Sequence, residues 1–283
     1  MPDIGPPKFP QLPIFVYGLL KPGELGFSQI GDFVLSSRRA TVKGALRLRD
    51  GIPLFDPKCE GDVDGYIVEF TSSSSDDAWA VIRAFEPASQ YEWSVSESNY
   101  AGGGLRVNVL AGRKLDVGTT LEPLPIWSVR DDPVFKEGLA AVRRLIDQAA
   151  PKGIEPQPDD DGFWQTFFEL QAAYLLLWSA IERYTSFKYG PLLKPWERIT
   201  MLNVDQDFLM AAKMTGATSG EVVDSRNPRT TYQLNKNPAK YYYQIRSNLS
   251  HRGKSAFRDA KLVFDAANQL LKILHTLLNN LDD

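Results

Sequence analysis

The hydrophobic pattern of this 283-residue chain changes its period once, and that change limits the fold more than any single motif does. In the first part, short apolar segments alternate with period two between turns that contain Gly and Pro, which is typical of half-buried strands. After residue 162, apolar residues recur at helical spacing over long segments. The segment between them, Pro151 to Gly162, is rich in Pro, Gly and Asp and is typical of a linker. We therefore predict an α+β protein in which a strand-rich domain precedes a helical domain.

The composition excludes several classes of protein. One cysteine, Cys59, rules out an internal disulfide framework and a Cys-rich zinc site. The two histidines are 24 positions apart, so we expect neither a metal centre nor a cofactor that depends on one. The N-terminus has no basic region followed by an apolar core, and the most apolar run, Leu170 to Ile181, is too short to span a bilayer. We expect a cytoplasmic protein without membrane contact.

The strand pattern of the first part surrounds a single helix. Period-two or apolar strand segments are expected at 13–23, 41–48, 65–70, 91–98 and 105–110. A run of Ser and Asp at 72–77 offers several caps for a helix that carries Trp79, Ile82 and Phe85. This arrangement predicts a small barrel or curved sheet, on which Trp127 packs back. We divide the chain into a lead-in (1–12), a strand domain (13–128), a segment with one helix and the linker (129–161) and a helical domain (162–283).

Five short motifs of the strand domain resemble, in their order, the gamma-glutamylcyclotransferase-like (AIG2-like) fold. They are Val16-Tyr-Gly-Leu-Leu-Lys-Pro-Gly23, Ala40-x-Val-x-Gly44-x-Leu46, Gly51-Ile-Pro53, Gly61-x-Val-x-Gly65 and Ala84-Phe-Glu-Pro-x-x-x-Tyr91. The resemblance covers residues 13–128 and implies a small β-barrel.

The resemblance also implies a chemistry. In that family the amine of a gamma-glutamyl group attacks its own side-chain carbonyl and releases 5-oxoproline. Glu86 would be the general acid and base, because a carboxylate must move a proton from the amine to the leaving group. The backbone from Tyr17 through Gly18 and Leu19 to Leu20 would hold the substrate carboxylate, with Tyr91 also in the substrate site.

Three positions depart from the family pattern. Leu19 stands where Ser or Thr is common, Pro87 follows Glu86 where Gly is usual, and Trp93 replaces a frequent basic residue. Pro87 removes an N–H and stiffens the turn. The alternative is therefore a barrel that keeps the fold while Glu86 is only a carboxylate at a helix end.

The helical domain is expected to be an all-helical bundle, because no strand pattern competes. Helices are expected at 163–188, 205–214 and 255–281, and a further one begins after Asn237-Pro238, includes Tyr241 to Tyr243 and ends near Gly253. At least one of the three tyrosines should be core, and His275 should be packed in the last helix. The expected aromatic core is Trp164, Phe167, Phe168, Tyr174 and Trp178.

A basic segment in this domain carries a second motif. From Arg226 to Lys261 there are nine Lys or Arg against one acid, in a chain of formal net charge −3. Ile245-Arg-Ser-Asn-Leu-Ser-His-Arg-Gly253 resembles the Arg-x4–6-His signature of HEPN domains, helical bundles that often act as ribonucleases, and Glu182 resembles an acidic position of that family. The resemblance implies Arg246 and His251 as the catalytic pair of a metal-independent ribonuclease.

The residue types suit that reaction. His251 could activate a 2′-hydroxyl, Arg246 could stabilise the phosphorane, and Asn248 or Ser250 could bind a phosphate oxygen. Five positions on a helix rotate by about 140°, so the pair needs a helix end near Ser250 or a site shared by a homodimer.

Three functions follow from these patterns. The first is a HEPN-type ribonuclease that binds RNA, forms a homodimer and carries the barrel as a regulatory or ligand-sensing domain, which would suit a toxin or a defence effector. The second is a gamma-glutamyl cyclotransferase, or a related enzyme that processes gamma-glutamylamines, in which Glu86 acts on a small molecule and the helices dimerise. The third is a non-catalytic binding protein.

Overall fold

The computed structural model describes residues 4–149, 161–217, 219–252 and 256–281, so most of the predicted linker lies outside the described residues. The chain forms two compact units. The first contains the chain up to Asp132 together with Phe187–Leu192 and the end from Leu281, and the second contains Pro133–Ser186 and Leu193–Asn280. The short segment Phe187–Leu192, which contains the last three residues of a helix of the other unit and the residues after it, therefore belongs to the strand-rich unit.

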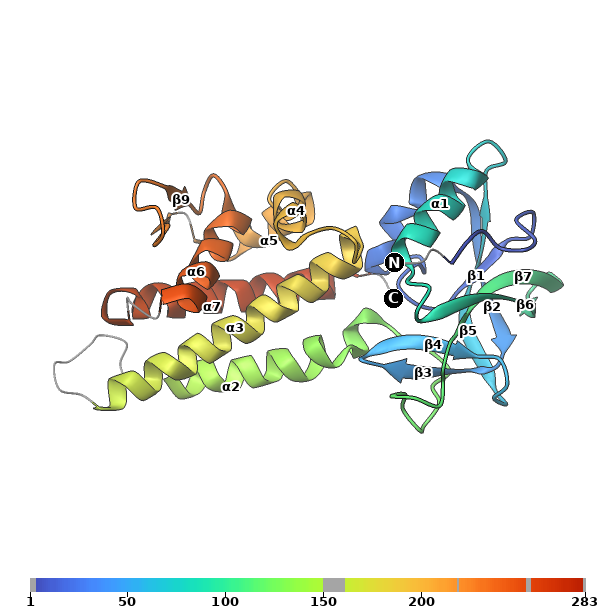
Figure 1. The fold of residues 1–283 in the computed structure, drawn as a ribbon, viewed down its shortest axis with the longest axis horizontal. Coiled ribbons are helices and arrows are strands. Elements are labelled where there is room, and N and C mark those ends of the chain that lie inside the picture. Colours follow the sequence, from blue (N-terminus) through green and yellow to red (C-terminus); the bar gives the residue numbers. More distant parts are fainter. Residues whose placement is uncertain (1–3, 150–160, 218, 253–255, 282–283) are drawn as a thin grey trace. The chain divides into compact units, whose positions relative to one another are not determined.

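The first unit is built on a sheet of seven strands and one helix. The elements are β1 (Ile14–Val16), β2 (Val34–Lys43), β3 (Ala45–Arg49), β4 (Ile52–Asp56), β5 (Asp62–Phe70), α1 (Ser75–Phe85), β6 (Tyr91–Tyr100) and β7 (Gly103–Gly112). The strand order is β1-β5-β2-β6-β7-β4-β3, and β1 also pairs in parallel with β7. This additional pairing closes a circuit of strands, so the predicted barrel is confirmed (Figure 1).

The barrel core is formed by the inward residues of the strands and one face of α1. Trp79, Ile82 and Phe85 of α1 are buried in it. Trp127 is fully buried, and its Nε1 donates to the Gly51 carbonyl at 3.0 Å, so the predicted return of this residue onto the barrel is confirmed. Gly65 permits the close crossing of β5 and β1, because a Cβ there would lie 2.4 Å from the Val16 carbonyl oxygen.

The second unit is mainly helical. A π-helical turn (Val134–Gly138) leads into α2 (Leu139–Ala149), and the further helices are α3 (Asp161–Tyr189), α4 (Pro195–Leu202), α5 (Gln206–Met214), α6 (Pro238–Arg252) and α7 (Ala256–Asn279). The prediction of a purely helical domain is wrong in one respect. Strands β8 (Glu221–Val223) and β9 (Thr231–Gln233) pair as an antiparallel hairpin between α5 and α6.

The aromatic core of the second unit differs in part from the prediction. Trp164 and Phe168 are 41% and 58% exposed, so they are not core residues, while Phe167, Tyr174 and Trp178 are buried as expected. His275 is exposed and not packed as predicted. Tyr241 and Tyr242 are buried, which confirms that at least one of the three tyrosines is core. None of the described helices has the length and apolar composition of a membrane span.

Candidate functional site

The loop after β1 contains a row of unpaired backbone donors. Among the described residues, the N–H groups of Gly18, Leu19 and Leu20 have no hydrogen-bond partner. The loop is nevertheless fixed, since the Lys21 N–H donates to the Gly18 carbonyl at 3.1 Å. Gly26 also supports it, because a Cβ there would lie 2.9 Å from the Leu19 carbonyl oxygen. Backbone donors left unpaired in a fixed loop are suited to bind an anionic group.

The Tyr17 side chain holds the barrel together beneath this loop. Its hydroxyl donates to the Leu110 carbonyl at 2.5 Å and accepts from the Phe55 N–H at 3.3 Å. The Tyr91 hydroxyl similarly donates to the Pro53 carbonyl at 3.0 Å. Both rings are buried. The Tyr17 phenol therefore stabilises the barrel, and any contact of Tyr17 with a substrate would be made by its backbone.

Glu86 stands at the end of α1, where its N–H donates to the Ile82 carbonyl at 2.9 Å. Burial raises the pKa of its carboxyl to about 8. No hydrogen bond or ion pair joins this carboxyl to another described residue. The pKa of Tyr17 is raised, chiefly by burial and then by the negative charge of Glu86, which places the carboxyl within electrostatic reach of the phenol. Glu86 is thus an acid that no described side chain engages, within electrostatic reach of the Tyr17 phenol.

The three residues that depart from the family pattern all make contacts that stabilise the barrel unit. Pro87 starts the turn into β6, because its carbonyl accepts from the N–H groups of Gln90 and Tyr91. Leu19 packs against the same apolar cluster as Phe85. Trp93 contacts Trp79 edge-to-face at a centroid distance of 5.5 Å, and its Nε1 donates to the Gly5 carbonyl at 2.9 Å.

A pocket of about 490 Å³ adjoins Glu86. Its wall includes Phe85 and Gln90, and also Pro191 and Leu192 from the segment that follows α3. The Gln90 Oε1 atom is buried without a hydrogen-bond partner among the described residues. Sequence reasoning missed Pro191 and Leu192, because it assigned them to the helical domain and the sequence carries no signal that returns them to the barrel unit.

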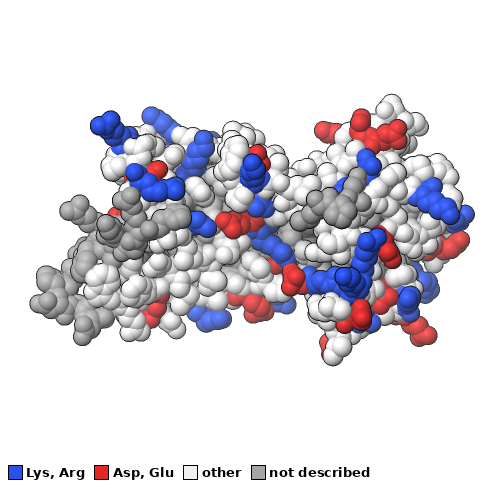
Figure 2. Space-filling view, in the orientation of Figure 1, with Lys and Arg blue, Asp and Glu red and all other residues white. Residues whose placement is uncertain are grey.

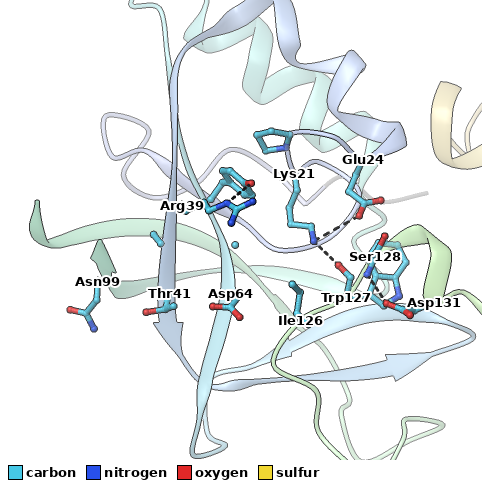
Figure 3. Close-up of a pocket in the computed structure, with 14 residues that line it drawn as sticks. Lys21, Glu24, Arg39, Thr41, Asp64, Asn99, Ile126, Trp127, Ser128 and Asp131 are labelled. Atoms are coloured by element: carbon cyan, nitrogen blue, oxygen red, sulfur yellow. Dashed lines mark hydrogen bonds and ion pairs between the residues drawn. The ribbon is translucent and has the colours of Figure 1, made fainter. Parts of the chain in front are cut away.

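A second pocket of the barrel unit, of about 580 Å³, surrounds Lys21 (Figure 3). The Lys21 Nζ donates to the Trp127 carbonyl at 2.5 Å and lies 3.8 Å from the Glu24 carboxylate. Burial lowers the pKa of Lys21 and raises that of Glu24. Glu24 also accepts from the Val129 N–H at 3.1 Å. No site residue in this pocket was predicted from the sequence, because its walls come from five separate stretches of chain.

The helical unit brings Arg246 and Glu182 together. The Arg246 Nη2 lies 4.0 Å from the Glu182 Oε1, which also accepts from the Trp178 Nε1 at 2.9 Å. Figure 2 shows Lys and Arg gathered at the end of this unit that carries the β8–β9 hairpin, where Arg226 and Lys236 are exposed. The basic character predicted for this stretch is therefore present at the surface.

The remaining predicted ribonuclease residues are differently placed. Asn248 connects α6 to the hairpin: its Oδ1 accepts from the Ser225 N–H at 3.1 Å, and its Nδ2 donates to the Val223 carbonyl at 2.9 Å. Ser250 is exposed, and the side chain of His251 lies outside the described residues. Because α6 continues to Arg252, no helix end near Ser250 brings Arg246 and His251 together within one chain.

The described residues contain no group of three His, Cys, Asp or Glu side chains that could hold a metal ion.

Comparison with known proteins agrees with the barrel. The family model for gamma-glutamyl cyclotransferase, AIG2-like, matches residues 14–114. The first unit is thus a β-barrel of this type, followed by a helical region, and the predicted fold class is confirmed. No curated protein matches the chain. A solution structure of a protein from Arabidopsis thaliana matches with 18% identity and a TM-score of 0.31, over 52% of this chain and 96% of that one.

Proposed function

We propose that the barrel unit is a gamma-glutamyl cyclotransferase that releases 5-oxoproline from a gamma-glutamyl amine or amino acid. The observation that carries this proposal is Glu86, a carboxyl whose pKa of about 8 is set by burial and which no other described side chain engages. Glu86 stands where the resemblance expects the general acid and base. The free N–H groups of Gly18, Leu19 and Leu20 support it, because they are where the resemblance expects the substrate carboxylate.

The reaction requires one proton to move between two nitrogens. The substrate amine attacks the carbonyl carbon of its own side-chain amide, so that a C–N bond closes the five-membered ring and the original amide C–N bond breaks. Glu86 in its ionised form accepts the proton from the attacking amine and returns it to the departing nitrogen. The proton balance is therefore closed without a metal or a cofactor.

The pocket beside Glu86 suits the departing group. Phe85, Pro191 and Leu192 give it apolar walls. A gamma-glutamyl compound with an apolar leaving amine would fit against these walls.

The pKa of Glu86 predicts how the rate depends on pH. With a pKa of about 8, only a minor fraction of Glu86 is ionised at pH 7, and this fraction grows as the pH rises. We expect kcat/KM to rise from pH 6 and to level off above about pH 8. A rate that falls over this interval would contradict the role of Glu86 as the base.

The test is release of 5-oxoproline from a panel of gamma-glutamyl amino acids and gamma-glutamylamines, measured by chromatography. Glu86→Gln keeps the shape of the side chain and removes its acid–base function, so we expect a loss of about 10²- to 10⁴-fold in kcat. Glu97→Gln, at an exposed position on β6, is the matched control and should leave the rate unchanged. If Glu86→Gln retains the rate of the control, the proposal is wrong.

A ribonuclease activity of the helical unit is a second hypothesis, and one observation favours it: Arg246 pairs with Glu182, the acid that the sequence associated with it. RNA and a second copy of the chain are the partners that it requires. Neither the comparisons nor the described residues support a role as a toxin or a defence effector.

The test of this hypothesis is degradation of bulk RNA in EDTA, together with light scattering for the oligomeric state. Arg246→Ala should abolish cleavage. Lys236→Ala removes a basic side chain just before α6 and should only weaken RNA binding. Intact RNA at several protein concentrations, or a strict monomer, would reject the hypothesis.

A further inference from the structure

A row of polar side chains crosses three strands at the pocket around Lys21. Strand pairing places Asn99 opposite Thr41 and Thr41 opposite Asp64, and residues directly opposite in an antiparallel sheet lie on the same face. Figure 3 shows the three side chains next to one another. None of them has a hydrogen-bond partner among the described residues. The row therefore offers an amide, a hydroxyl and a carboxylate to a ligand.

Arg39 adds a cation to the same face. It precedes Thr41 by two residues and pairs with Tyr66, so it lies diagonally from Asp64, at a Cα separation of about 7–8 Å. Its Nε donates to the Tyr66 hydroxyl at 3.1 Å, which orients the guanidinium, while its terminal nitrogens have no partner among the described residues. A guanidinium with free terminal nitrogens is the preferred partner of a carboxylate.

The floor of the pocket is the buried ion pair of Lys21 and Glu24, whose side chains are 9% and 7% exposed. The Lys21 ammonium has three donors, of which one is given to the Trp127 carbonyl. The charges of Glu24, Asp131 and Asp64 all act on Lys21, which shows that these three carboxylates converge on the pocket. Trp127 and Ile126 supply an apolar wall.

The pocket carries both positive and negative side chains, and this mixture determines which kind of ligand it can bind. A purely anionic ligand would meet the carboxylates of Asp64 and Asp131, and a purely cationic one would meet Arg39 and Lys21. A molecule that carries both charges a few bonds apart can place its carboxylate at Arg39 and its ammonium at Asp64. We propose that this pocket binds a small zwitterion of amino-acid or dipeptide size, at a site formed by residues other than Glu86 and the loop from Gly18 to Leu20.

The test is saturation-transfer NMR of the full chain with L-leucine and glycyl-L-leucine as probes. Two blocked analogues separate the charges: N-acetyl-leucine lacks the ammonium, and leucine amide lacks the carboxylate. We expect both zwitterions to bind, and each blocked analogue to bind at least about tenfold more weakly, because a charge-assisted hydrogen bond is lost.

Two exposed positions allow variants that leave the core intact. Asp64→Asn and Arg39→Gln should each weaken probe binding about tenfold or more. Asp62→Asn is the matched control, because Asp62 stands two residues from Asp64 on the same strand and pairs with Lys43 outside the pocket. Binding should be unchanged in this control and also in Glu86→Gln.

Several results would overturn the proposal. These are failure of both zwitterions to bind at millimolar concentration, blocked analogues that bind as well as the zwitterions, or Asp64→Asn and Arg39→Gln variants that behave like Asp62→Asn. Loss of binding in Glu86→Gln with full binding in Asp64→Asn would place the probe at the cyclotransferase site, which also rejects the pocket. The catalytic proposal is tested separately, because probe binding does not require turnover.

Discussion

The two units differ in how their candidate functional side chains are engaged. In the barrel unit, Glu86 is half-buried at the end of α1, with a carboxyl whose pKa is raised by burial and which has no partner among the described residues. In the helical unit, Arg246 is paired with Glu182 and Asn248 is bound to the β8–β9 hairpin. Burying an ionisable group without a partner costs free energy, so such a group points to a function more strongly than a motif whose members stabilise the fold. This difference favours the barrel as the catalytic unit.

The largest expected effect that tests this difference between the units is the change in the free energy of unfolding with pH. In the folded protein Glu86 has a pKa of about 8, whereas an unfolded glutamate ionises near its ordinary value of 4.5. Between these two values the unfolded chain releases the proton and the folded chain retains it, so stability falls as the pH rises. We expect Glu86→Gln to gain stability relative to the wild type between pH 5 and pH 8, by about a few kcal/mol at 1.4 kcal/mol for each unit of pKa.

Denaturant unfolding at several pH values measures this difference, with Glu97→Gln as the control that should follow the wild type. If the free energy of unfolding depends on pH in the same way in the wild type and in Glu86→Gln, the pKa of Glu86 is not raised by folding. Glu86 would then not differ from the engaged side chains of the helical unit.

The second effect tests whether Asn248 is a structural residue. Asn248→Ala removes the acceptor for the Ser225 N–H and the donor to the Val223 carbonyl, and we expect a loss of about 1–3 kcal/mol in the free energy of unfolding. Ser250→Ala, two positions along the same helix at an exposed site, should change it by less than about 0.5 kcal/mol. If Asn248→Ala keeps full stability, the contacts of Asn248 do not stabilise the fold. The wild-type side chain would then be available to bind a phosphate, which would strengthen the ribonuclease hypothesis.

The barrel could be predicted because its strands and motifs are local, but several elements were not predicted, among them most of β2, strand β4, helix α4 and the β8–β9 hairpin. Strand β4 contains Pro53, which argues against a strand in sequence patterns. The strands of the β8–β9 hairpin have three residues each, too few to show a period within a helical region.

The sites were predictable only in part. Glu86 and the loop at Gly18 follow from the resemblance, whereas the raised pKa of Glu86 depends on burial, which no local pattern encodes. The pocket around Lys21 is assembled from Arg39, Asp64, Asn99 and Trp127, which are far apart in the sequence, so only the strand register brings them together.

The smallest effect concerns the pair of Arg246 and Glu182. Their side chains are 31% and 40% exposed and 4.0 Å apart, so we expect a coupling free energy below about 1 kcal/mol in a double-mutant cycle of Arg246→Ala and Glu182→Ala. Unfolding measured at two salt concentrations should show the coupling decrease at the higher one, because exposed charges are screened. A coupling above about 2 kcal/mol that persists in salt would mean that the pair is desolvated in solution, as it would be if a second copy of the chain covered it. That result, combined with a dimer in light scattering, would reverse the comparison and move the search for catalysis to the helical unit.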